Sequence, residues 1–187
     1  MLHISFNPFP LLESERLYLR EITPDDVKEV FAIRSDADTM KYIPRPLAKT
    51  QQDALDHIDV IAKGIADDQF IHWAITLKHE TKLIGMICLL RMQPENYRTE
   101  IGYILNSDFR GLGIMDEAVK TVIRYAFGTL MFHSMEAVID PLNGASEKVL
   151  LRNNFVKEGH FKQNQYYDGR FLDTVIYSLI NKDSPGR

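Results

Sequence analysis

The alternation of apolar and polar residues predicts seven β-strands. The first lies at residues 16–22, where apolar and polar side chains alternate as they do on a half-buried strand. Two helices then precede three strands in succession, and two more strands stand at the end of the chain. The predicted strands cover residues 16–22, 70–78, 82–92, 97–105, 134–140, 155–166 and 171–180.

Four helices are expected between these strands. The segment Thr23–Asp26 predicts a helix start, because Thr can cap, Pro suits the first turn and Asp favours the positive end of a helix. This helix should end before Pro44. A second helix begins at Thr50 and keeps apolar residues at helical spacing as far as Ile65. A third begins near Met115, and a short fourth covers about residues 145–153.

The order of these elements predicts a mixed sheet. The strand 97–105, a glycine-containing loop, a helix and the strand 134–140 form a β-α-β crossover, so these two strands should be parallel. The hairpins around them should be antiparallel. The 187 residues suit one domain. We therefore expect a single α/β domain over residues 1–187, with a mostly antiparallel sheet of about seven strands flanked by about four helices.

Composition and charge exclude several classes of protein. With 45% hydrophobic and 26% charged residues, the chain is an ordinary globular one. Its formal charge of −4 gives no general attraction to nucleic acid or anionic membranes, so any phosphate binding must be local. The N-terminus lacks a signal-peptide pattern, and no apolar run approaches about 18 residues. We expect a cytoplasmic protein that binds neither nucleic acid nor a membrane.

The cysteine and histidine residues predict neither a disulfide nor a metal site. Cys88 is the lone cysteine, and it lies in the apolar run Leu83–Leu90. Because apolar burial raises the pKa of a thiol, this position favours a core residue over a nucleophile. The six histidines show no paired spacing on one predicted helix.

A glycine loop at a strand-to-helix junction predicts an anion site. Free N–H groups at a helix start carry partial positive charge, and glycines let the backbone approach an anion closely. An arginine in the loop adds a forked donor. The expected phosphate or pyrophosphate site consists of Arg110, Gly111, Leu112, Gly113, Ile114 and Met115. The alternative is a plain glycine turn entering a helix; the Walker and dinucleotide-binding motifs do not match.

The segments around this loop resemble a known superfamily. Thr99–Leu105 followed by Arg110–Ala118 is similar to the core of the GNAT acetyltransferases, whose loop cradles the pyrophosphate of coenzyme A. The resemblance is closer to the branch containing the ribosomal-protein N-terminal acetyltransferases. Ser14–Arg20, the pair Asn143 and Ser146, and Asp173–Leu179 also match that branch. The resemblance spans about residues 12–180 and implies a GNAT fold.

Two residues depart from the superfamily's pattern. Met115 stands where a small residue is usual, although this branch tolerates Met there. Asp116 stands where Thr is usual, which places an acid one residue beyond the loop. An acid near a helix start is favourable for the helix dipole. We expect its side chain to turn to solvent rather than to repel a bound phosphate.

The resemblance implies an acetyl-CoA-dependent N-acetyltransferase that works through a ternary complex. A protein N-terminus is the acceptor known for this branch, but a small amine, a polyamine or an amino-sugar antibiotic would fit equally well. Homodimers are common in the branch, so a homodimer is a further expectation. Two alternatives come from other classes: a non-catalytic acyl-CoA-binding sensor or regulatory module, and nucleotide binding through the same loop.

Acetyl transfer to an amine needs a base, a donor to the developing oxyanion and a proton donor for the thiolate. Glu100 is the candidate base, because a carboxylate is poorly suited to a central strand and Gly102 on the same face leaves room beside it. The alternative is a sheet edge or a pair with a cation such as Arg98. The oxyanion donor is expected to be a main-chain N–H near Leu105 or Asn106.

Further candidates lie at the start of the last helix. Asn143 and Ser146 are three residues apart, so both can lie on one side of it. By resemblance, Asn143 contacts the pantetheine arm and Ser146 is the acid near the sulfur, with Tyr103 as an alternative acid. The structural alternative is N-capping by Asn143. Arg152, with Lys148, either reaches the 3′-phosphate of coenzyme A or forms a solvated face.

Overall fold

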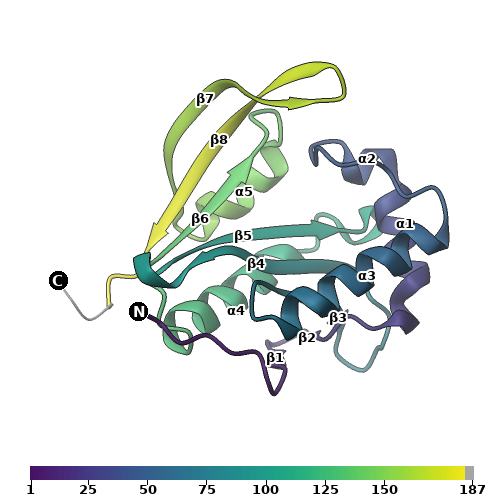
Figure 1. The fold of residues 1–187 in the computed structure, drawn as a ribbon, viewed down its shortest axis with the longest axis horizontal. Helices are drawn as coiled ribbons and strands as arrows, with labels where there is room; N and C mark the ends of the chain where they lie inside the picture. The colour runs from purple at the N-terminus through teal and green to yellow at the C-terminus, as the bar shows by residue number, and fades with distance from the viewer. Residues whose placement is uncertain (184–187) are drawn as a thin grey trace.

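The computed structural model describes residues 1–183 and has a single eight-stranded sheet at its centre (Figure 1). The strands lie in the order β1-β2-β3-β4-β5-β6-β8-β7. Among the strands of residues 1–183, only β5 and β6 pair in parallel, which confirms the predicted crossover; the other neighbours are antiparallel. The strands are β1 (Leu12–Glu13), β2 (Leu17–Arg20), β3 (Ile71–Leu77), β4 (Gly85–Gln93), β5 (Arg98–Leu105), β6 (Ser134–Ile139), β7 (Val156–Tyr167) and β8 (Arg170–Ile180).

In the described part of the chain, five α-helices accompany the sheet. They are α1 (Val27–Ser35), α2 (Ala37–Met40), α3 (Gln51–Ala66), α4 (Ile114–Gly128) and α5 (Gly144–Arg152). The predicted start of α3 is confirmed, because Thr50 forms a capping box with Asp53. The Asp53 backbone N donates to Thr50 Oγ1 at 3.3 Å, and the Thr50 backbone N donates to Asp53 Oδ2 at 2.9 Å.

The prediction differs from the structure at two places near the N-terminus. The two-residue strand β1 was not expected, which gives eight strands rather than seven. The first predicted helix is broken into a 3-10 turn at Pro24–Asp26, α1 and α2. Asp36 interrupts it, because its Oδ2 accepts from the Thr39 backbone N at 2.9 Å and so caps a new helix.

The helices cover both faces of the sheet. α1 and α3 contact each other, and α3 contacts β3, on the near side in Figure 1. α4 contacts β1, β2 and α5, and lies on the far side. The Trp73 ring of β3 meets Tyr125 of α4 edge-on, with ring centroids 5.7 Å apart. The core therefore consists of two apolar layers, one on each side of strands β2–β5.

The sheet opens between its two parallel strands. β5 and β6 pair only through Arg98 with Ser134, Thr99 with Met135 and Glu100 with Glu136. Beyond these pairs the two strands diverge, and β6 continues with β8 and β7 as a separate arm of the sheet (Figure 1). The second half of β5 therefore has a sheet neighbour only on its β4 side.

Candidate active site

A cavity of about 490 Å³ lies where β5 and β6 diverge. It is lined by the end of β5, the glycine loop with the start of α4, the segment from α2 to Ile43, and the start of α5. Its size is in the range of small-molecule sites. Four basic side chains (Lys41, Arg110, Lys148 and Arg152) and two acidic ones (Asp38 and Asp116) line it, so the cavity suits an anionic ligand.

Most of the predicted cofactor-binding residues line this cavity. They are Leu105, Arg110, Gly111, Gly113, Ile114, Met115, Asn143, Ser146 and Arg152. Asn106 and Leu112 are not among the lining residues. The Leu112 side chain points outward, and the residue is 57% exposed. The two glycines beside it have positive φ angles, 78° at Gly111 and 74° at Gly113, which is the conformation that glycine adopts without strain.

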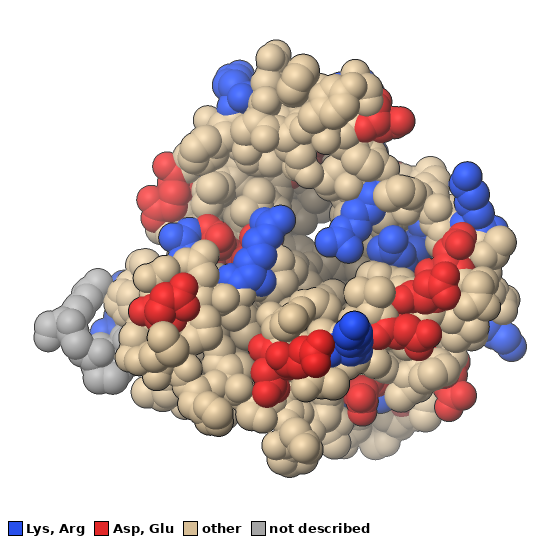
Figure 2. Space-filling model, viewed as in Figure 1, with Lys and Arg blue, Asp and Glu red and all other residues tan. Residues whose placement is uncertain are grey.

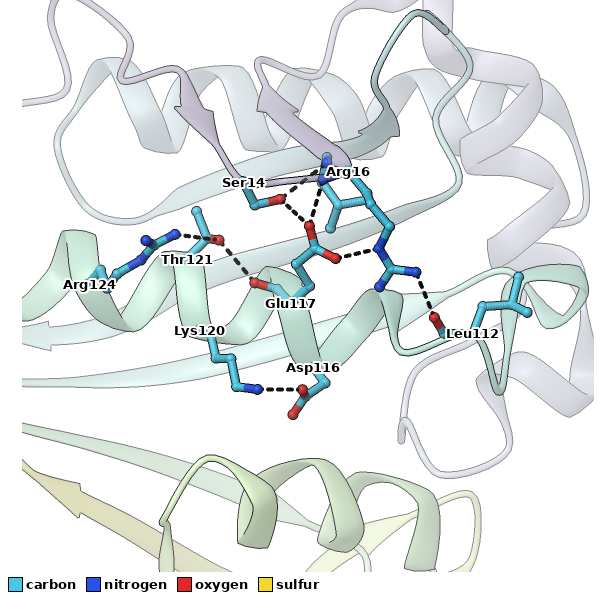
Figure 3. Close-up of polar contacts among 9 residues, drawn as sticks. Ser14, Arg16, Leu112, Asp116, Glu117, Lys120, Thr121 and Arg124 are labelled. Atoms are coloured by element: carbon cyan, nitrogen blue, oxygen red, sulfur yellow. Dashed lines mark hydrogen bonds and ion pairs between the residues drawn. The ribbon is translucent and has the colours of Figure 1, made fainter.

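An ion pair from the N-terminal segment holds the glycine loop (Figure 3). Arg16 Nη1 donates to the Leu112 carbonyl oxygen at 3.0 Å, and its Nε donates to Glu117 Oε2 at 2.6 Å. Glu117 Oε1 accepts from the Arg16 backbone N at 2.8 Å and from Ser14 Oγ at 2.6 Å. The pKa of Glu117 lies below its usual value: burial raises it, but the bonds from Ser14 and Arg16 outweigh that effect.

Sequence reasoning missed this role. In the sequence, Ser14–Arg20 indicates only a resemblance to a family, and nothing in its spacing connects it to Glu117, about one hundred residues later. The only local signal was an acid in the first turn of α4. In the structure, Arg16 fixes the carbonyl of Leu112 on the outside of the loop. It therefore fixes the orientation of the peptide groups whose N–H atoms begin the helix.

Arg110 is bound to α2. Its Nη1 donates to Asp38 Oδ2 at 2.5 Å and its Nη2 donates to Thr39 Oγ1 at 2.9 Å. Both ionic groups are well exposed, so the pair contributes little to stability. The guanidinium can therefore exchange this carboxylate for another anion at small cost, and its predicted phosphate contact stays a prediction.

The expectation that Asp116 turns to solvent is wrong. Its side chain is 20% exposed, and Oδ2 accepts from Lys120 Nζ at 2.7 Å. Its Oδ1 accepts from Asn153 Nδ2 at 2.9 Å. Asp116 thus links α4 to the end of α5, and Lys120 partly offsets its charge, which reduces the repulsion that an acid beside the loop would otherwise exert.

Glu100 lies on β5 and is only 8% exposed. Its Oε2 accepts from Arg91 Nη1 at 2.7 Å, whereas Arg98 pairs with Glu136, so the cation expected beside Glu100 is Arg91 and not Arg98. The pKa of Glu100 is raised, first by burial; Arg91 lowers it and Glu136 raises it further. Such a carboxyl accepts a proton more readily than an exposed one.

The N-terminus of α5 faces the end of β5. Asn143 Oδ1 accepts from the Ser146 backbone N at 3.1 Å, which confirms the capping alternative for Asn143. Both residues also line the cavity. Tyr103 Oη donates to the Ser146 carbonyl oxygen at 3.4 Å, and burial raises the pKa of Tyr103 above its usual value. The two candidate proton donors, Ser146 and Tyr103, therefore lie together where the strands diverge.

Of the two candidate oxyanion donors, Asn106 is already engaged. Its backbone N donates to the Ile84 carbonyl oxygen at 2.9 Å. Successive residues of a strand direct their N–H groups alternately to the two sides. The Leu105 N–H therefore points toward the side from which β6 has diverged, and Leu105 lines the cavity.

Three further expectations concern features away from the cavity. Cys88 is 7% exposed, and burial raises its pKa to about 12, which confirms a core thiol. Within residues 1–183, no three His, Cys, Asp or Glu side chains gather closely enough to hold a metal ion. No helix in the same part of the chain is long and apolar enough to cross a membrane.

A glycine loop at a helix start, facing a strand pair that diverges over a cavity with basic side chains, is the arrangement expected for the acyltransferase class that the sequence resembles. The chain belongs to the GNAT acetyltransferase family: the family model described as "Acetyltransferase (GNAT) domain" matches residues 16–156. The chain is therefore an acetyl-CoA-dependent N-acetyltransferase, and the predicted GNAT fold is confirmed.

Known proteins support this assignment. The chain is 31% identical over 172 residues to the uncharacterized N-acetyltransferase YoaA of Bacillus subtilis, covering 92% of this chain and 97% of that protein. It is 34% identical over 103 residues to the ribosomal-protein-serine acetyltransferase of Escherichia coli, covering 54% of this chain and 56% of that one. A GNAT-family acetyltransferase from Bacillus anthracis superposes with a TM-score of 0.82 at 25% identity, covering 91% and 98% of the two chains.

Proposed function

We propose that this enzyme acetylates a primary amine by direct attack of the amine on acetyl-CoA in a ternary complex. One observation carries the proposal: a single cavity joins a glycine loop and helix start to the point where β5 and β6 diverge. The first end suits the phosphates of coenzyme A, and the second suits the thioester. The buried carboxylate of Glu100 lies on β5 at the last residue pair before the divergence.

The cofactor-binding roles follow from the lining of the cavity. N–H groups of Gly111, Gly113, Ile114 and Met115 would bind the pyrophosphate, and Arg110 would add its guanidinium. Leu112 would contribute through the backbone that Arg16 holds.

The start of α5 would bind the remainder of coenzyme A. The Asn143 amide N is free of the cap and can donate to the pantetheine arm, because the cap uses Oδ1. Arg152, with Lys148 on the same helix, would bind the 3′-phosphate.

The catalytic roles follow from the geometry near the divergence. Glu100 takes the proton of the attacking amine, and its raised pKa makes it a better base near neutral pH. Because Glu100 is not among the residues that line the cavity, we route this proton through a water molecule. The Leu105 N–H donates to the thioester oxygen as negative charge develops. Ser146 donates a hydrogen bond to the departing thiolate, with Tyr103 as the alternative donor.

The acceptor that we favour is a protein N-terminus. The partial match to a ribosomal-protein-serine acetyltransferase supports this class, and a small amine is the alternative. A cytoplasmic location and the capacity to form a homodimer belong to the same proposal, as does the absence of direct binding to nucleic acid or a membrane.

Calorimetric titration with acetyl-CoA, free CoA, ATP and NAD tests the cofactor assignment first. We expect acetyl-CoA and CoA to bind in preference to ATP and NAD, because the cavity offers contacts along the whole pantetheine arm. An acceptor screen with N-terminal peptides, polyamines and aminoglycosides, followed by free-thiol release, tests the transfer. Equal binding of all four ligands, or none, would contradict the cavity assignment; binding without transfer to any amine would favour a sensor.

Two substitutions should move the pH dependence in opposite directions. Arg91→Gln removes a charge that lowers the pKa of Glu100, so the acidic limb of kcat/KM should move to higher pH. Glu136→Gln removes a charge that raises this pKa, so the limb should move to lower pH. A general base must be deprotonated, so activity falls below its pKa. The pH profile of kcat/KM provides the measurement.

Arg91→Lys keeps the charge and is the matched control, for which the limb should stay in place. The Arg91 side chain is 68% exposed, so these changes should not unfold the protein. Shifts in the same direction for Arg91→Gln and Glu136→Gln would show that the limb reports another group.

A further inference from the structure

The sheet face that carries Glu100 also carries a row of three neighbouring residues, His72 of β3, Cys88 of β4 and Gly102 of β5. Glu100 is two residues before Gly102, so both project to this face. A methyl group added at Gly102 would lie 3.1 Å from Cys88 Sγ. The absence of a side chain at Gly102 therefore leaves space on this face of the sheet. An amine that gives its proton to Glu100 therefore lies on this face, beside the row.

Two arginines lie on the α1–α3 side of this row: the charge of Arg45 acts on His72 and Cys88, and that of Arg34 acts on His57 of α3. Arg34 is in the last turn of α1, and Arg45 is in the segment that follows α2. The Ala48 backbone N donates to the Arg34 carbonyl oxygen at 3.0 Å, which places this segment against the end of α1.

The charges of these arginines reach two histidines. The pKa of His57 on α3 is lowered to about 4, first by burial and then by Arg34 and Arg45. The pKa of His72 is lowered to about 3, first by burial and then by His57 and Arg45. Both histidines are therefore neutral at neutral pH, and the two guanidinium groups carry the local charge.

Neither arginine has an anionic partner in the described part of the chain. Arg34 and Arg45 form no ion pair there, and Arg34 Nε is buried without a hydrogen-bond partner. Burial lowers the pKa of Arg34, and the charge of Arg45 lowers it further. Arg34 gains some stabilisation at the C-terminal end of α1, but this accounts neither for its unpaired Nε nor for Arg45. A buried donor without a partner is costly, so Arg34 favours an anion that the described residues do not supply. Arg45 is exposed and adds its positive charge nearby.

The charge distribution on this side of the molecule also favours binding of an anion. Figure 2 shows Lys and Arg side chains on both sides of the hollow that lies below the β7–β8 hairpin. At the β5–β6 side, Arg91 and Arg98 are already bound to Glu100 and Glu136. Arg34 and Arg45, on the side of α1 and α2, have no such partner among residues 1–183.

We propose that the acceptor carries a carboxylate close to its reacting amine, and that Arg34 and Arg45 bind this carboxylate. The proposal rests on the proposed function, because it requires the amine to reach Glu100. The planar guanidinium matches a carboxylate with two parallel donors. The carboxylate belongs either to a Glu or Asp side chain near a peptide N-terminus or to the α-carboxylate of a free amino acid.

Initial rates of thiol release with matched acceptors test this proposal. Three peptides with the same N-terminal Ser would differ only in carrying Glu, Gln or Lys at their second and third positions. Free glutamate and its α-amide form a second arm, which separates a side-chain carboxylate from an α-carboxylate. We expect kcat/KM to fall from the Glu peptide to the Lys peptide by roughly tenfold or more, the effect of one charge-assisted hydrogen bond.

Charge reversal at the arginine should reverse the preference. Arg45→Glu should favour the Lys peptide, and Arg45→Lys should keep the wild-type order, with KM for acetyl-CoA unchanged in both. Arg34→Met should weaken the preference and also raise Tm, because it removes an unpaired buried donor. Arg124→Glu is the matched control, since it makes the same charge change on α4, and it should leave the order of the peptides unchanged.

Equal rates with the three peptides together with equal rates for glutamate and its α-amide, or a preference that Arg45→Glu leaves unchanged, would overturn the proposal. Acetylation of none of these acceptors by an enzyme that binds acetyl-CoA would also overturn it, while leaving the cofactor assignment intact. Failure to bind acetyl-CoA would instead overturn the proposed function. An increase in KM for acetyl-CoA in Arg45→Glu would assign Arg45 to the cofactor and not to the acceptor.

Discussion

Replacing Glu100 by glutamine is expected to lower kcat by about 10²–10⁴-fold, the usual effect of a general base, and to leave the Kd for acetyl-CoA unchanged. Glutamine keeps an oxygen that can accept from Arg91 Nη1 but cannot take a proton at neutral pH. Glu100 is not among the residues that line the cofactor cavity, so cofactor binding should survive. Thiol release gives kcat, and calorimetry gives Kd.

The matched control for this change is Glu136→Gln. Glu136 is the direct neighbour of Glu100 on β6 and is also paired with an arginine, but it is not assigned to the proton transfer. Its replacement should leave the plateau value of kcat near wild type. A Glu100→Gln enzyme with wild-type turnover would remove Glu100 from the mechanism and leave it as the structural partner of Arg91.

Replacing Arg16 by methionine is expected to raise the Kd for acetyl-CoA by roughly tenfold or more, with kcat at saturating acetyl-CoA nearly unchanged. The change removes the donor that holds the Leu112 carbonyl and one of the bonds to the Glu117 carboxylate. The peptide groups of the glycine loop would then lose their fixed orientation. Methionine keeps most of the length and the apolar contacts of the side chain.

Stability should fall together with affinity. Bonds to a charged group contribute about 1.5–3 kcal/mol, and a chain of this size loses about 2–4 °C in Tm per kcal/mol. The control is Arg124→Met, because Arg124 lies on the same helix as Glu117 and contacts only Thr121 in this network (Figure 3). A lower Tm with an unchanged Kd would show that Arg16 stabilises the fold without positioning the loop.

Elements with strong local signals could be predicted from the sequence. The helix that begins after Thr50 has both a capping residue and a long apolar stripe, and β5 with its crossover is fixed by the loop and helix that follow. β1 has two residues, which are too few to show any period. The break at Asp36 was missed because the apolar pattern continues across it, although an Asp three residues before Thr39 is a capping signal.

The candidate site likewise combines local features that the sequence predicts with distant contacts that it does not. The glycine loop is a local feature, and the sequence was sufficient to place it at the end of a strand and the start of a helix. The partners of its residues are distant in sequence: Asp38 for Arg110, and Arg16 for Glu117. Tertiary packing decides such pairs, as it decides that Arg91 rather than Arg98 contacts Glu100. The sequence shows which side chains can react but not which cation lies next to them.

The three residue pairs that join β5 to β6 have a mechanical consequence. They connect two parts of the sheet, β1–β5 and β6–β8–β7, and form a short hinge at one end of the gap between β5 and β6. A rotation of a few degrees at this hinge would change the width of the gap most at the end far from the hinge, where Leu105 and α5 lie. A ligand bound in this gap would set the angle between the two parts of the sheet. Because the β7–β8 hairpin belongs to the same part of the sheet as β6, its position would depend on the ligand bound in the gap.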